Sequence, residues 1–160
     1  MYLDALSFLE DERDGWRAYE PLADLTDEQL DAPRDDIHGW TARDLIAHMV
    51  AWQEMALAVA RDLAVNETSP TKAVADAEWV ARGDDVNDEI NATWRTLPPD
   101  EVRRRLRTAA GELRGYLTVV PETRWLKNSE MLNFFLSETV DHYEDHRGDL
   151  RAVLASPSGR

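Results

Sequence analysis

Residues 40–65 decide the fold, and they read WTARDLIAHMVAWQEMALAVARDLAV. Thr41 is a good helix N-cap, and Asp44 stands three residues later, which is the spacing of a capping box. The apolar residues that follow recur every three or four positions, the period of one helix face. That face carries Leu45, His48, Met49, Trp52, Met55, Ala56, Val59 and Leu63. The segment therefore predicts a long core helix with a histidine inside its apolar stripe.

Proline and glycine residues divide the rest of the chain into further helical segments. No segment shows the period-two alternation of a strand, whereas apolar stripes at helical spacing recur along the chain. A short helical turn is expected at Thr26–Leu30, where Thr26 can cap and Gln29 can reach back. The other expected helices span residues 2–20, 71–97 with Gly83 as an interruption point, 100–120 with Pro99 in its first turn, and 129–154.

These helices predict an all-α fold in one domain. Four long helices without strands favour a four-helix bundle, and 160 residues fit a single domain. The bundle is expected over residues 1–154, with the long middle segment as a crossover connection. Residues 155–160 are expected to form a flexible C-terminal tail.

Composition excludes several classes of protein. The chain has no cysteine, which rules out thiolate catalysis and cysteine-ligated metal centres. Its net charge of −14 argues against binding to nucleic acid or to an anionic membrane. The start lacks the basic and apolar regions of a signal peptide, and the most apolar stretch, residues 47–65, contains charged side chains. We therefore expect a cytoplasmic protein whose partner is a small molecule.

The clearest chemical motif is the pair His142 and His146 in the last helix. Histidines four residues apart lie on one helical face, where two imidazoles can bind one cation. His48 lies on the apolar face of another helix, and the cores of helix bundles are where facing helices build metal sites. Three neutral imidazoles suit a divalent metal such as zinc, nickel, iron or copper, with zinc or nickel the first expectation. The alternative is three histidines that pack in the core or face solvent and never meet.

Carboxylates near these histidines can support them, because a metal-bound imidazole usually donates its second N–H to an acidic or carbonyl group. Asp44, Glu138, Asp141 and Asp145 are the candidates. Asp44 is better explained as the helix cap. Glu138 lies one turn before His142 and near the inward face, so it can be a ligand, a base or part of a pocket wall. A plain surface carboxylate is the alternative for Glu138.

Several aromatic and histidine positions flank these candidates. Tyr143 and Trp52 can line a pocket, although packing is the more common role of aromatic residues on helices. Trp40 can pack against Leu45 as a hydrophobic staple. His38 stands in the loop before the second long helix, where we expect it to be exposed.

The region around the second helix resembles a known group of proteins. The stretch Gly39-Trp40-Thr41-Ala42-Arg43-Asp44-Leu45-Ile46-Ala47-His48, followed by Trp52, resembles the second-helix signature of the DinB-like (DinB/YfiT) superfamily. His142 and His146 complete the three-histidine pattern of that superfamily, and the resemblance extends to Leu154. Two branches are the most similar. One is the ClbS/DfsB type, and the other is the N-terminal type of the mycothiol-dependent maleylpyruvate isomerase.

The resemblance implies an up-down-down-up bundle, a divalent metal on His48, His142 and His146, and often a homodimer. It also implies metal-assisted hydrolysis or thiol-dependent transfer on a small electrophilic substrate. Because the chain lacks cysteine, a thiol would have to come from a low-molecular-weight cofactor such as mycothiol. In this enzyme hypothesis, Glu138 is the catalytic residue that moves a proton.

Two other hypotheses stay open at the level of sequence. In the first, the protein is a non-catalytic stress-response or self-protection bundle that binds a metal or a small molecule. In the second, the bundle is purely structural. Fold alone does not decide among these functions, because one fold supports many unrelated activities.

Overall fold

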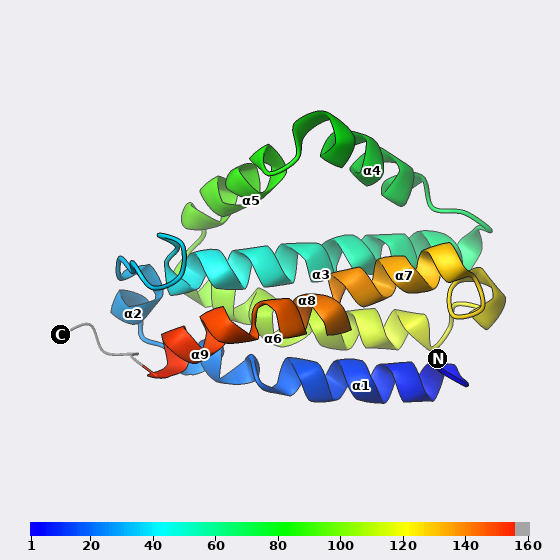
Figure 1. Ribbon diagram of the computed structural model, residues 1–160, viewed down its shortest axis with the longest axis horizontal. Helices are drawn as coiled ribbons and strands as arrows, with labels where there is room; N and C mark the ends of the chain where they lie inside the picture. Colours follow the sequence, from blue (N-terminus) through cyan, green and yellow to red (C-terminus); the bar gives the residue numbers. More distant parts are fainter. Residues whose placement is uncertain (156–160) are drawn as a thin grey trace.

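The computed structural model describes residues 1–155, and every regular element among them is a helix (Figure 1). The all-α prediction is therefore confirmed. Ala155 belongs to the last helix, and residues 156–160, where the flexible tail is expected, lie outside the described part. The elements are α1 (Ala5–Arg17), η1 (Glu20–Asp24), α2 (Asp27–Asp31), α3 (Ala42–Val65), α4 (Pro70–Arg82), α5 (Asp85–Arg95), α6 (Pro99–Leu117), η2 (Glu122–Arg124), α7 (Ser129–Glu138), α8 (Val140–Asp145) and α9 (Arg147–Ala155).

The body of the molecule consists of α1, α3, α6 and the consecutive helices α7–α9. In Figure 1, α1 and α7–α9 run in one direction, whereas α3 and α6 run in the opposite direction. The helices α4 and α5 pass over α3 and join its end to the start of α6 at the other end of the molecule. This crossover allows two consecutive long helices to run parallel.

Reciprocal hydrogen bonds start two helices where the sequence predicts them. Thr41 Oγ1 accepts a bond from the Asp44 N–H at 3.2 Å, and the Asp44 carboxylate accepts one from the Thr41 N–H at 3.1 Å. Thr26 and Gln29 form the same capping box at the start of α2. The Asp44 carboxylate also accepts two bonds from Arg95 of α5, at 3.0 and 2.9 Å. The cap of α3 therefore also anchors the crossover.

The crossover bends at Gly83. This residue has φ 52° and ψ −130°, a conformation that is close to the region open only to glycine. The predicted segment 71–97 therefore forms two helices, α4 and α5, that meet at the expected interruption. None of the residues of α4 is buried, so this helix lies on the surface of the bundle.

The last helix differs from the prediction of one continuous helix over residues 129–154. It is broken at Thr139 and again at His146. At the first break, the Thr139 N–H donates to the carbonyl of Leu136 at 3.2 Å and leaves the carbonyl of Phe135 without its helical partner. The Thr139 hydroxyl donates to that Phe135 carbonyl at 2.6 Å, which stabilises the break.

The first helix and α6 are shorter than predicted. Asp4 accepts a hydrogen bond from the Ser7 N–H at 2.9 Å and caps α1, so the helix starts at Ala5 and not at residue 2. It ends at Arg17, after which the chain enters the 3₁₀ helix η1. Helix α6 begins at Pro99 as predicted and ends at Leu117, before the expected residue 120.

Apolar side chains from all four body helices form the core around α3. Burial of this apolar surface supplies the main stabilising free energy of the fold. No helix in residues 1–155 combines the length and the apolarity that crossing a bilayer requires. The fully buried aromatic residues and α3 side chains include Phe8, Trp125, Phe135, Tyr19, Tyr143, Leu45, Ile46, Met49 and Leu63.

Candidate metal centre

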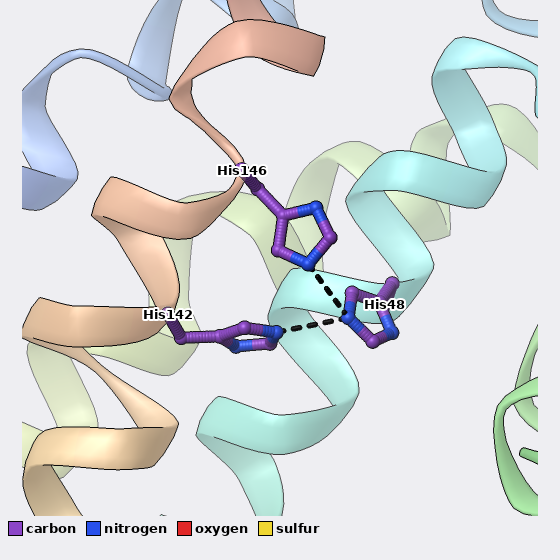
Figure 2. A group of neighbouring side chains, drawn as sticks. All are labelled: His48, His142 and His146. Carbon is purple, nitrogen blue, oxygen red and sulfur yellow. Dashed lines mark hydrogen bonds between the residues drawn. The ribbon is translucent and has the colours of Figure 1, made fainter. Parts of the chain in front are cut away.

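The three predicted histidines meet between α3 and α8 (Figure 2). His142 Nε2 lies 2.9 Å from His48 Nε2, and His146 Nε2 lies 3.1 Å from the same atom. One ring nitrogen of each histidine lies within 4.8 Å of the other two. The alternative in which the histidines never meet is therefore wrong.

Each histidine reaches this point from a different local structure. His48 lies in the second turn of α3 and is 8% exposed. His142 lies within α8, and His146 connects α8 to α9 with φ −96° and ψ 8° (Figure 2). The sequence spacing of four correctly brings the pair to one side of α8, although the helix ends before the second histidine.

Asp149 fixes the orientation of His146. The Asp149 carboxylate accepts a hydrogen bond from His146 Nδ1 at 2.9 Å. A neutral imidazole that donates from Nδ1 carries its lone pair on Nε2, the atom that faces His48. The other Asp149 oxygen lies 3.5 Å from Nε2 of the exposed His38. Asp149 was not among the carboxylates that the sequence suggested as partners of the histidines. Its position three residues after His146, about one helical turn, is the sequence feature that could have indicated this role.

The aromatic ring of Trp40 covers the same cluster. Its centroid lies 5.1 Å from that of His48 and 6.2 Å from that of His146, and it is nearly parallel to the His146 ring. Trp40 precedes the Thr41 cap, so the turn that starts α3 also places this ring. The contact restricts the rotation of two imidazoles and shields them from solvent.

Burial keeps two of the imidazoles neutral. Burial and the two neighbouring histidines lower the pKa of His48 to about 3, and burial and His146 lower the pKa of His142 to about 4. A neutral imidazole offers one lone pair and one N–H. At neutral pH, His48 and His142 therefore present nitrogen lone pairs without a positive charge that would repel a cation.

The contacts among the three Nε2 atoms fit a cation better than they fit hydrogen bonds. In a neutral His146 whose Nδ1 donates to Asp149, Nε2 carries no proton. If His48 Nε2 carries a proton, that single proton cannot serve both neighbouring nitrogens; if it carries none, its lone pair faces that of the neutral His146 at 3.1 Å. A zinc or nickel ion bound by all three lone pairs would remove this conflict. The buried Nδ1 atoms of His48 and His142 have no hydrogen-bond partner in the described residues.

The cluster opens onto a cavity of about 650 Å³ bounded by α3, α4, α5, α7 and α8. His48 and His142 form part of its wall, together with Trp52 and Glu138. Burial raises the pKa of Glu138 to about 7. Trp52 therefore lines a pocket, one of its two predicted roles, and Glu138 faces the same space as the histidines.

The other predicted carboxylates do not support the histidines. Asp44 is the α3 cap and the partner of Arg95, which confirms the simpler explanation given for it. Asp141 and Asp145 are exposed. Glu138 shares the cavity but is not a member of the histidine cluster. Its role as the catalytic residue stays a prediction.

Tyr143 packs in the core instead of lining the cavity. Its hydroxyl donates to Glu12 at 2.7 Å and accepts a bond from Gln53 at 2.8 Å. Arg114 donates to the second Glu12 oxygen at 2.6 Å. These bonds tie α8, and therefore the adjacent His142, to α1, α3 and α6. The sequence feature that could have indicated this network is Glu12, an acidic residue at an inward position of the first helix.

The sequence of this chain is similar to a known family of proteins. A sequence model described as the mycothiol maleylpyruvate isomerase N-terminal domain matches residues 10–133. The matched range covers more than three quarters of the chain, includes His48, and ends before His142 and His146. No curated protein and no solved structure shows significant similarity. The chain therefore belongs to the mycothiol maleylpyruvate isomerase N-terminal domain family, which has a DinB-like fold.

Proposed function

We propose that this protein is a metal-dependent enzyme that activates water or a low-molecular-weight thiol for attack on a small electrophilic substrate. The observation that carries the proposal is the position of the histidine cluster. Its three imidazoles converge at the wall of a cavity large enough for a small molecule, and a carboxyl group faces the same cavity.

The three histidines would hold the metal through their Nε2 atoms, and Asp149 would keep His146 in the ligating tautomer. Three protein ligands leave a position for water or substrate, as in catalytic zinc sites. When bound, a divalent ion supplies Lewis acidity and lowers the pKa of a bound water or thiol.

Glu138 would move the proton in this reaction. A carboxyl group with a pKa of about 7 is present in both protonation states near neutral pH. It can therefore accept a proton from the O–H or S–H of the nucleophile and return it to the leaving group. Because the chain has no cysteine, a thiol nucleophile would enter as a small cofactor. The family description supports mycothiol in that role.

Turnover by the metal-loaded protein tests this proposal. Zinc- and nickel-loaded samples should be assayed with epoxides, esters, amides and α,β-unsaturated carbonyl compounds, each with and without a low-molecular-weight thiol. Glu138→Gln should keep the metal and the fold and lower kcat by about 10²–10⁴-fold, because an amide cannot accept the proton. Glu10→Gln, on the exposed surface of α1, is the matched control.

Two results would contradict the proposal. Full activity in Glu138→Gln would remove this residue from the mechanism. Loaded protein that binds small molecules from the panel but converts none of them would instead favour the non-catalytic binding protein.

A further inference from the structure

Aromatic side chains form much of the cavity wall. Trp52 and Trp79 meet edge to face with ring centroids 5.8 Å apart, and Phe134 contributes a third ring. The Trp52 indole N–H donates to Asn87 at 3.0 Å, which holds the ring in place between α3 and α5. Trp79 is 44% exposed, so a large apolar surface remains available at the mouth. Such surfaces favour flat apolar ligands.

Apart from the histidine cluster, where the proposed metal would bind, the described lining of the cavity offers no free cation to an anionic ligand. Lys72 is the only lysine or arginine among its described lining residues. Its ammonium group lies 2.6 Å from Asp76 and 3.2 Å from Glu130, and 5.6 Å from the Phe134 ring centroid. Two carboxylates and an aromatic face thus already surround this single positive charge.

The remaining charge in the wall is negative. Asp76 and Glu130 pair with Lys72, and no ion pair joins the third carboxyl group, that of Glu138, to a cation in residues 1–155. Glu138 therefore lies in an aromatic-walled space without a positive partner. A ligand with a positive group would supply that partner, whereas a carboxylate ligand would meet repulsion in the metal-free protein.

We propose that the cavity binds a flat aromatic molecule with an amino group. The amine would face Glu138, and the ring would lie against Trp52 and Trp79. This binding preference comes from the cavity wall and does not depend on the proposed function.

Three small probes with one ring and one two-carbon arm test the preference. Tyramine is cationic, tyrosol is neutral, and 4-hydroxyphenylacetate is anionic. Their affinities should be measured by calorimetry at a fixed, mildly alkaline pH in the presence of a chelator, so that no metal can bind the carboxylate. We expect tyramine to bind about ten-fold more tightly than tyrosol, and 4-hydroxyphenylacetate to bind most weakly.

Variants locate the binding. Glu138→Gln should bring the affinity for tyramine down to that for tyrosol and leave the affinity for tyrosol unchanged. Glu10→Gln should alter neither affinity. Trp79→Ala should weaken the binding of tyramine and of tyrosol by the same factor, because it removes only part of the apolar wall.

The proposal is overturned if the anionic probe binds as tightly as the amine, if none of the probes binds, or if Glu138→Gln leaves the order unchanged. These outcomes do not depend on metal retention or turnover. A failed metal or activity assay with the predicted order of affinities would reject the proposed function and leave the cavity preference in place.

Discussion

Asp149 fixes one of the three imidazoles of the site. Its carboxylate accepts the His146 Nδ1 proton, so its loss would free the ring to rotate and to change tautomer. We predict that Asp149→Asn lowers zinc affinity by about 10–100-fold without unfolding the protein. Competition against a chromophoric chelator measures this affinity.

His38→Ala is the control for that variant, because His38 approaches the same carboxylate. Its side chain is 77% exposed and lies 3.5 Å from Asp149, so the contact should contribute little. Equal zinc affinities of the wild type and Asp149→Asn would show that the carboxylate does not position the ligand.

The Glu138 carboxyl makes stability depend on pH. Its folded-state pKa of about 7 lies above its ordinary value of 4.5. The native state therefore holds this proton more tightly than the unfolded state does, and the stabilisation is lost as pH rises through 7. Relative to Glu138→Gln, the wild type should lose about 2–3 kcal/mol of stability between about pH 5 and pH 9.

Urea denaturation of both proteins in the presence of a chelator measures this difference. The histidines titrate in both proteins, so their contributions cancel. The stability of Glu10→Gln should equal that of the wild type at every pH. A difference between the wild type and Glu138→Gln that stays constant with pH would mean that the carboxyl is not buried as described.

At the scale of the element, the bend between α4 and α5 depends on one glycine. A side chain at Gly83 is strained whatever the surrounding space, because φ is +52°. Gly83→Ala should cost about 1–3 kcal/mol in urea denaturation. Gly115→Ala, inside α6 where nothing lies within 4 Å of the added Cβ, should stabilise by about 0.5–1 kcal/mol. Equal effects of the two substitutions would contradict the account of the crossover.

The elements that sequence predicted well are the ones set by local interactions. The start of α3 needs only Thr41 and Asp44, and its apolar face needs only the period of its own residues. These signals also placed His48 correctly on an inward face. The meeting of His48 with His142 and His146 followed from the spacing and from the superfamily resemblance.

The breaks in the last helix could not be predicted in the same way. The apolar period continues through Thr139 and His146, so the pattern indicates one uninterrupted helix. The breaks coincide with contacts from other parts of the chain, including the Tyr143 bonds to Glu12 and Gln53 and the close approach of Tyr143 to Gly15. Such contacts join residues far apart in sequence and leave no local pattern.

At the scale of the whole molecule, the Glu12–Tyr143 network connects four helices behind the site. Burial raises the pKa of Glu12, and the bonds from Arg114 and Tyr143 oppose that rise. Tyr143→Phe removes one of these bonds from a buried carboxylate and should destabilise the protein by about 1–3 kcal/mol. Tyr116→Phe, at a 37% exposed position, should change stability by less than about 0.5 kcal/mol.

Thermal denaturation of the two tyrosine variants checks this prediction. Equal melting temperatures would show that the network adds nothing to the stability of the fold.

The homodimer and the cytoplasmic location that the sequence suggests stay predictions.

The central claim is that His48, His142 and His146 form a metal centre. Elemental analysis of protein loaded with zinc or nickel and then desalted tests it most directly. We predict about one ion per chain in the wild type and in His38→Ala, and almost none in His48→Ala, His142→Ala or His146→Ala. Circular dichroism should show that each variant is folded. A wild type without bound metal, or folded ligand variants that retain as much metal as the wild type, would contradict the claim.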